Sequence, residues 1–189
     1  MTSMSMVPIL IKENRSVMAT KQQQDFCKAV YDAAKKINEI SPLFVAAQAC
    51  LESAWGARKV GNYNIFGITK GSNWNGKTVL VLTSEVFNVP GKKFYPPEKV
   101  VSVIKTSQGK YRYKVYRQFK DFGSYDECLK EHLRIFKKPG YADAWPYRRN
   151  AYEFAKKIAD CKGCKYATDP NYATVMRAMI ESVRKIVEE

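Results

Sequence analysis

The stretch VAAQACLESAWG, residues 45–56, predicts a buried helix that carries one carboxylate, Glu52, near its end. Ser41 followed by Pro42 is typical of a helix start, and Gly56 is typical of a left-handed cap, so we expect the helix to end at this glycine. Between these signals the residues are almost all apolar. Because a helix that is apolar on all sides is normally buried, this segment should form the centre of the fold.

Glu52 has two interpretations. A buried glutamate often forms a salt bridge that has only a structural role. However, a carboxyl group at the C-terminal end of a buried helix is subject to desolvation and to the negative end of the helix dipole, and both disfavour the anion. A glutamate held near its protonated form is what general acid catalysis requires. Gln48 lies four positions earlier, so the two side chains share one face of the helix.

Length and composition indicate a single globular domain. The chain has 189 residues, of which 46% are hydrophobic and 26% charged, and these values are ordinary for a folded protein. Residues 1–19 resemble a loose N-terminal arm, and residues 20–189 should form the domain. The start lacks the basic leader and the small-residue cleavage site of a signal peptide. We therefore expect synthesis in the cytoplasm and, for action outside it, delivery by another route.

The net charge of +14 is unevenly distributed. Residues 57–120 hold 13 Lys and Arg against two acids, Glu85 and Glu98, so this third of the chain has a charge of +11. Such a field favours a polyanionic partner. Nucleic acid, acidic lipid and the anionic bacterial envelope all fit this requirement, and charge alone does not choose among them.

The five cysteines do not indicate a disulfide framework or a metal site. Cys161 and Cys164 form a single C-x-x-C, whereas zinc sites need four ligands, and His132 is the only histidine. His132 has helical apolar neighbours and is expected to be a satisfied structural residue. We expect no metal and no cofactor.

The order of the elements predicts a mostly helical α+β fold with a small basic β lobe at about 68–120. Thr20 and Gln23 form a capping box that starts a helix. Periodicity predicts helices, then strands, then helices again. The first helices span residues 21–39 and 42–56, and the strands span 78–83, 100–106 and 111–117. The later helices begin at 124 and span 151–159 and 173–187.

Several blocks of the sequence resemble, in order, the glucosaminidase domain of family 73 glycoside hydrolases. They are AAQACLESAWG, NYNIFGI, WNGKTVLVLTSE, YRYKVYRQFKDFGSYDECLKEHLRIF and YATDPNYATVMRAMI. The resemblance covers about residues 22–187, which is nearly the whole chain. It implies a lysozyme-like helical domain with the β lobe over a substrate cleft, and hydrolysis of β-1,4 bonds of peptidoglycan, typically after N-acetylglucosamine.

The resemblance also assigns roles to three residues. Glu52 matches the catalytic acid of the family, Glu85 matches its second carboxylate in the β lobe, and Tyr166 matches a tyrosine implicated in catalysis. Glycoside hydrolysis usually uses two carboxyl groups, one with a raised pKa and one ionised. Because Glu85 lies among 13 cations, we expect it to stay ionised. The alternative for Glu85 is a surface residue at a strand end, paired with a lysine; Tyr166 could equally be a packing tyrosine.

Substrate contacts are predicted at further positions besides Gln48. Trp55, Phe66 and Trp74 could supply flat apolar faces for sugar rings, although Trp55 could equally belong to the core. The side-chain amide of Asn64 could bind an acetamido group or cap a turn.

Three functions from different classes follow. The first is a peptidoglycan hydrolase, most similar to a phage endolysin or virion lysin, that acts on the cell wall as a monomer after holin-type, virion or secretion-system delivery. Its basic region would bind anionic envelope polymers. The second is a nucleic-acid-binding protein, suggested by the cations and aromatics of YRYKVYRQFK, but without a zinc-finger, RNP-type or recognition-helix signal. The third is a catalytically silent wall-binding relative.

Overall fold

The computed structural model describes residues 19–161, 166 and 170–188. The arm predicted at residues 1–19 therefore lies almost wholly outside the described residues. Within them, five α-helices and a three-stranded antiparallel sheet confirm the predicted helix-rich α+β class. In this part of the chain no helix combines the length and hydrophobicity needed to cross a bilayer.

The first two helices begin where their capping signals predict. α1 (Lys21–Ile37) starts with the Thr20–Gln23 capping box, in which each side chain accepts a hydrogen bond from the other residue's backbone. α2 (Pro42–Glu52) starts at Ser41, whose hydroxyl accepts a hydrogen bond from the Phe44 backbone N–H. Leu51 and almost all residues before it in α2 are buried, so α2 is the central helix of the domain.

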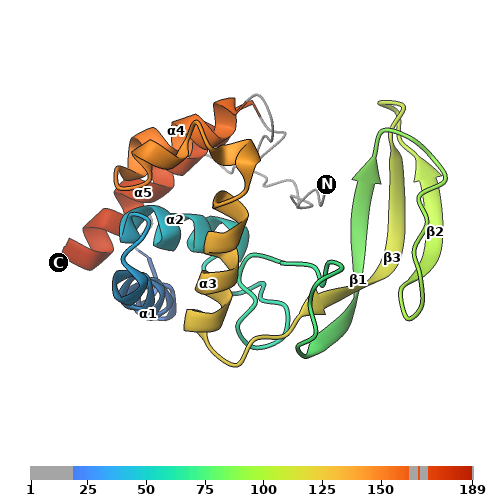
Figure 1. Cartoon of the computed structure of the whole chain (residues 1–189), viewed down its shortest axis with the longest axis horizontal. Coiled ribbons are helices and arrows are strands. Elements are labelled where there is room, and N and C mark those ends of the chain that lie inside the picture. The colour runs from blue at the N-terminus through green and yellow to red at the C-terminus, as the bar shows by residue number, and fades with distance from the viewer. Residues whose placement is uncertain (1–18, 162–165, 167–169, 189) are drawn as a thin grey trace.

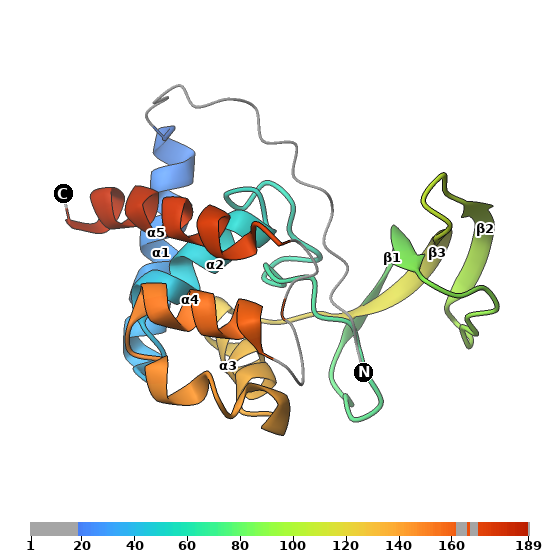
Figure 2. The ribbon, with the colours of Figure 1, turned by 90° about the horizontal axis from the view of Figure 1, so that it is seen from above.

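The other helices surround α2. They are α3 (Tyr125–Phe136), α4 (Ala151–Asp160) and α5 (Tyr172–Glu188), with two short 3₁₀ turns, η1 (Pro139–Tyr141) and η2 (Trp145–Tyr147), between α3 and α4. α2 packs against α1, α4 and α5, and Figure 2 shows α5 running alongside it. Edge-to-face rings of Phe44, Phe136 and Phe154 link α2 to α3 and α4, which fixes α2 within the core.

The sheet consists of β1 (Thr78–Phe87), β2 (Lys99–Lys105) and β3 (Tyr111–Lys120) in the order β1-β3-β2. The predicted hairpin of β2 and β3 is confirmed. β1 continues beyond the predicted end at residue 83 because residues 84–87 pair with residues 114–111 of β3. Figures 1 and 2 show the sheet projecting from the helical body, with β1 nearest the helices and β2 at the far edge.

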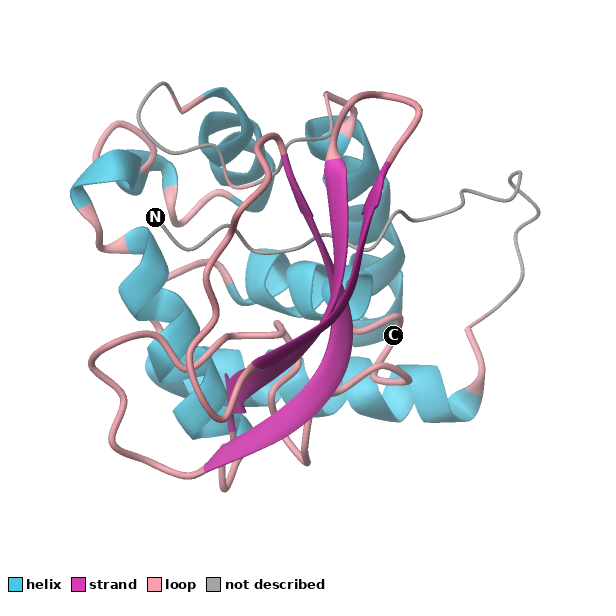
Figure 3. Cartoon of the chain, turned by 90° about the vertical axis from the view of Figure 1, so that its right-hand side faces the viewer, coloured by secondary structure: helices cyan, strands magenta, loops and turns pink. Residues whose placement is uncertain are grey.

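Strand alternation gives the sheet two faces. We call the side that carries Glu85, Tyr113 and Arg117 the site face, and the opposite side, with Leu82 and Tyr116, the outer face. The root of the sheet is attached to the loop after α2, since the Lys70 backbone N–H donates to the carbonyl of Gln118. Figure 3 shows the sheet in front of the helices. The loop after α2 thus connects the helix that carries Glu52 to the lobe that carries Glu85.

Candidate active site

Glu52 is the last residue of α2, so the helix ends one turn earlier than the cap predicted at Gly56. The backbone instead enters a left-handed turn, with φ of 49° at Ala54, 58° at Trp55 and 83° at Gly56. Ser53 stabilises this turn: its hydroxyl donates to the Ala49 carbonyl at 2.6 Å and accepts from the Gly56 N–H at 2.8 Å.

Glycine is required at position 56. A Cβ there would lie 2.6 Å from the Phe26 ring, and its φ is one that other residues rarely adopt. Because the chain turns sharply at residues 54–56, directly after Glu52, the Glu52 side chain lies at the edge of the core and not inside it.

The Glu52 side chain is partly buried. Desolvation raises the pKa of its carboxyl from the ordinary 4.5 to about 7. Among the described residues no cation forms an ion pair with Glu52, so the salt-bridge interpretation finds no support there. A carboxyl group that titrates near neutrality and reaches the surface has the properties of a general acid.

Three buried polar side chains surround Glu52. The Gln48 amide donates to the Tyr172 hydroxyl at 2.8 Å. Burial, and after it the Glu52 charge, raises the phenol pKa of both Tyr166 and Tyr172. The Tyr166 hydroxyl and the Gln48 Oε1 have no hydrogen-bond partner among the described residues. Buried polar atoms normally have partners, so these two atoms are the polar groups near Glu52 whose partners the described residues do not supply.

Tyr166 is also part of the aromatic core. Its ring stacks on Phe136, with centroids 5.4 Å apart, and only 5% of the residue is exposed. Packing fixes the ring while its hydroxyl stays unpartnered in the described structure. The catalytic and packing interpretations of Tyr166 are therefore compatible.

Glu85 lies within β1, on the site face, and only 5% of it is exposed. Its carboxylate lies 3.5 Å from Arg117 Nη1, and the Nε of the same guanidinium donates to Glu98 at 2.9 Å. Burial raises the Glu85 pKa, Arg117 opposes this increase, and the Glu98 charge adds to it. The alternative of a strand-end surface residue paired with lysine is wrong, because Glu85 is buried inside the strand and faces an arginine.

The segment of residues 88–98, which joins β1 to β2, folds over the site face beside Glu85. Phe94 packs against Phe87 and Tyr113, with ring centroids 6.3 Å and 5.9 Å away, and the Lys92 backbone N–H donates to the Tyr113 hydroxyl. Arg117 lies over the Phe94 ring. The burial of Glu85 is thus produced by its own lobe, and it explains why the cationic surroundings predicted from sequence do not lower its pKa.

Most of the predicted sugar-contact residues have structural partners. The Asn64 amide donates to the carbonyls of Ile68 and Lys120 and accepts from the Ile68 N–H, all at 2.9 Å. Asn64 therefore caps a turn, as the alternative prediction for this residue stated. Phe66 is buried and stacks on His132 at 3.7 Å.

The two tryptophans are partly buried against the core. The Trp74 indole donates to the Lys77 carbonyl, its edge meets Phe122, and the Lys120 ammonium lies 4.6 Å from its ring centroid. Trp55 lies in the left-handed turn directly after Glu52. Of the two, Trp55 is closer in sequence to the carboxyl group and is the better candidate for substrate contact.

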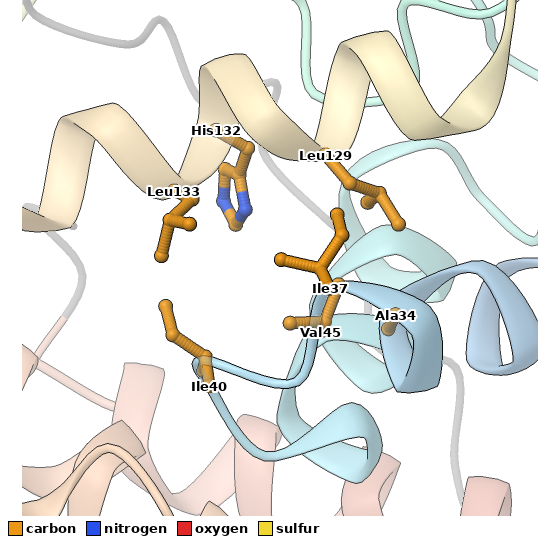
Figure 4. A pocket seen from close by; sticks show the side chains of 7 residues that line it. All are labelled: Ala34, Ile37, Ile40, Val45, Leu129, His132 and Leu133. Carbon is orange, nitrogen blue, oxygen red and sulfur yellow. The ribbon is translucent and has the colours of Figure 1, made fainter.

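A small apolar cavity lies apart from these residues, between α1, the start of α2 and α3 (Figure 4). His132 points into it between aliphatic side chains, and burial lowers its pKa to about 3. Its Nε2 has no hydrogen-bond partner among the described residues. The prediction of a structural histidine fits this position, although the ring is not fully satisfied as expected. The cavity lining includes none of the groups around Glu52.

The described residues contain no cluster of three or more metal-ligating side chains. Cys161 is buried, and Cys164 lies outside the described residues. Two neighbours of the carboxyl groups were missed from sequence, namely Tyr172 and Arg117. Tyr172 follows Tyr166 by six positions in the same block, and Arg117 lies on the same face of β3 as Tyr113, so both positions carried a detectable signal.

A glutamate with a raised pKa at the edge of a helical core, beside a β lobe with a second carboxylate, is the arrangement of a glycoside hydrolase. The comparison with known sequences agrees with this class. Residues 28–185 match the family Glucosaminidase, described as mannosyl-glycoprotein endo-beta-N-acetylglucosaminidase. The chain belongs to this family, which confirms the resemblance.

Two relatives illustrate the similarity. The peptidoglycan hydrolase FlgJ of Escherichia coli K12 is 29% identical over 152 residues, covering 77% of this chain and 41% of FlgJ. A probable N-acetylmuramidase of Lactococcus lactis subsp. lactis is 29% identical over 174 residues, covering 86% of this chain and 34% of the relative. The chain thus spans about two fifths or less of the length of these relatives.

Solved structures share the fold. A mutant peptidoglycan hydrolase from Sphingomonas sp. A1 matches with a TM-score of 0.63 and 25% identity, covering 87% of this chain and 98% of that one. The glycoside hydrolase domain of Salmonella typhimurium FlgJ matches with a TM-score of 0.62 and 25% identity, covering 86% and 98%. The predicted lysozyme-like fold is confirmed.

Proposed function

We propose that this protein hydrolyses β-1,4 glycosidic bonds in the glycan strands of peptidoglycan, as an endo-β-N-acetylglucosaminidase. The observation that carries the proposal is Glu52, whose carboxyl has a pKa of about 7 at the partly buried end of α2. Relatives named as peptidoglycan hydrolase and N-acetylmuramidase support the substrate class. Because the second name refers to the other sugar of the strand, the bond itself must be decided by experiment.

In the proposed reaction Glu52 donates its proton to the glycosidic oxygen as the bond to the leaving sugar breaks. Desolvation keeps this proton bound at neutral pH. The Gln48 Oε1 and the Tyr166 hydroxyl, which have no hydrogen-bond partner within the described part of the chain, lie beside Glu52 and would hold an acetamido group or the attacking water. These side chains come from different elements, so substrate binding would join α2 to the segment that precedes α5.

Glu85 is the proposed second carboxylate, and it would activate water or stabilise positive charge on the sugar ring. In the described structure it is covered by residues 88–98 and contacts Arg117. Its role therefore requires that this segment move so that Glu85 faces the glycan. If it does not, Tyr166 or the acetamido group of the substrate would take over the role.

The test is mass spectrometry of muropeptides released from purified peptidoglycan and then reduced with borohydride. Reduced N-acetylglucosamine ends support the proposal, whereas reduced N-acetylmuramic acid ends would show a muramidase. The Glu52→Gln variant is the matched control and should release neither product. Release of peptides without new reducing ends would contradict glycosidase activity altogether.

We further propose that the protein acts on the cell wall as a monomeric lysin, and that its basic region binds anionic envelope polymers through Lys92 and Lys93. The +14 charge supports such a partner. Delivery through a holin, a virion or a secretion system stays part of this proposal. Nucleic acid is the alternative partner, and a mobility-shift assay beside turbidity clearing of peptidoglycan separates the two functions.

A further inference from the structure

The outer face of the sheet exposes aliphatic and aromatic side chains where an antiparallel sheet normally presents polar residues to water. The exposed fractions, from 38% to 63% of each residue, belong to Leu80, Leu82, Val86, Ile104 and Tyr116. Strand register places them on one face in two groups: Leu80 and Leu82 lie beside Tyr116, and Val86 and Ile104 are both paired with Arg112. The row of Ser84, Lys114 and Ser102 separates the two groups. Exposed apolar side chains gathered on one face in this way indicate an interaction surface.

The same face carries cations and no acid. Its exposed charged residues are Lys99, Arg112 and Lys114. Of the remaining positions in register, Thr78, Ser84, Ser102 and Gln118 are uncharged, and Lys120 is buried and pairs with Glu131. Both acids of residues 57–120 lie elsewhere, since Glu85 and Glu98 contact Arg117 of the site face. The outer face is therefore amphipathic and positively charged.

We infer that this outer face docks the protein on an anionic lipid surface, with the cations at the headgroups and the apolar side chains in the acyl boundary. Apolar area combined with cations is what interfacial binding to acidic lipid requires. A hydrophilic phosphate polymer would neutralise Lys114 and Arg112 but would leave Leu80 and Leu82 in water. A second copy would bring the same cations against each other in a two-fold contact, which is unfavourable.

Docking through the outer face leaves the site face and Glu52 free, so the inference extends beyond the proposed glycosidase activity and does not depend on it. Lys92 belongs to a different surface, because it lies over the Phe87 ring of the site face. Binding to lipid and binding to wall polymers can therefore be separated by substitution.

The test is co-sedimentation of the full chain with vesicles of roughly 30% phosphatidylglycerol in phosphatidylcholine, compared with pure phosphatidylcholine, at about 0.15 M salt. We expect binding to the anionic vesicles only. Arg112→Glu with Lys114→Glu should weaken it at least about 25-fold, since each cation near such a surface contributes about fivefold. The matched control, Lys36→Glu with Lys156→Glu, makes the same charge change at exposed positions of α1 and α4 and should retain most of the binding.

The apolar part of the inference has its own variants. Leu80→Ser with Leu82→Ser should weaken vesicle binding about tenfold, whereas Tyr147→Ser, which removes a 40% exposed side chain from the helical body, should not. Activity on soluble glycan fragments should be unchanged in all of these variants, which shows that they fold. As a second measurement, the fluorescence of Tyr116→Trp should be quenched by brominated phosphatidylglycerol vesicles.

Three results would overturn the inference. The first is no binding to anionic vesicles, or binding without quenching of Tyr116→Trp. The second is equal affinity for inorganic polyphosphate chains with no effect of the leucine substitutions, which would identify a polymer site. The third is self-association that Leu80→Ser with Leu82→Ser abolishes, which would identify a contact between copies of the chain.

Discussion

The Glu52→Gln variant tests the catalytic hypothesis most sharply, because it removes the transferable proton and keeps the shape of the side chain. With a pKa of about 7 instead of 4.5, about half of the Glu52 carboxyls hold a proton at pH 7, compared with roughly 0.3% otherwise. The amide has no proton to transfer. We expect turnover on peptidoglycan to fall by about 10²- to 10⁴-fold, the usual contribution of a general acid.

The same pKa predicts the effect on stability. The folded state keeps the Glu52 proton between pH 4.5 and about 7, whereas the unfolded state loses it, so stability falls as the pH rises through this window. The loss of stability is absent below pH 4.5 and complete above about pH 7. It amounts to at most about 3 kcal/mol, and solvent that reaches the partly exposed carboxyl makes it smaller. Glu52→Gln should therefore be as stable as the wild type at pH 4 and more stable at pH 8.

Both effects are measured on one preparation. Release of reducing ends from purified peptidoglycan gives turnover, and denaturant unfolding at pH 4 and pH 8 gives stability. Wild-type turnover should also decline as the pH rises above about 7, since the acid loses its proton there. A variant that retains a tenth of wild-type turnover, or that loses stability at pH 8, would refute the reasoning about Glu52.

Glu85→Gln should reduce turnover less than Glu52→Gln does, because water can also be oriented by Tyr166 or by the substrate; equal losses for both variants on one peptidoglycan sample would contradict this order. Asn64→Ala should lower the free energy of unfolding by about 3 kcal/mol, since three buried hydrogen bonds are lost, with KM unchanged; an increased KM in the folded variant would return Asn64 to the substrate site. Lys92→Glu with Lys93→Glu should weaken binding to whole envelopes, and added salt should weaken wild-type binding in the same way. Equal binding of the variant and the wild type would show that these cations serve only solubility. EDTA should leave activity on purified peptidoglycan unchanged, and inhibition relieved by one particular metal would disprove the metal-free hypothesis.

The sequence predicts the elements well where local chemistry defines them. The Thr20 capping box, the Ser41–Pro42 start and the alternation of residues 111–117 each depend on neighbours in the chain, and all three are confirmed. The sequence predicts the end of α2 too late, because Gly56 is typical of a cap, whereas the left-handed turn already begins at Ala54. The local hydrogen bonds of the Ser53 hydroxyl and the tertiary contact with the Phe26 ring together fix the turn.

The candidate site was predictable only in part, for the same reason. The environment of Glu52 follows from an apolar helix, and that local pattern is visible in the sequence. The Tyr172 partner of Gln48, the Lys120 partner of Asn64 and the Arg117 partner of Glu85 lie 124, 56 and 32 positions away. No local pattern indicates which distant carbonyl, hydroxyl or guanidinium each side chain meets. Residue type alone could not distinguish an amide that caps a turn from one that binds a sugar.

The two carboxyl groups show why the cationic surroundings of the β lobe were a poor guide to ionisation. Glu52 is held near its protonated form by desolvation with no paired cation in the described structure, which suits an acid. Glu85 is buried too, yet Arg117 opposes its rise in pKa, and Glu98 shares the same guanidinium. Opening of residues 88–98 would return water to Glu85 and remove the main cause of its raised pKa. The pKa of Glu52 would stay raised, because its desolvation does not depend on this segment. Movement of one segment would therefore separate the two pKa values, so that one carboxyl group serves as acid and the other as base.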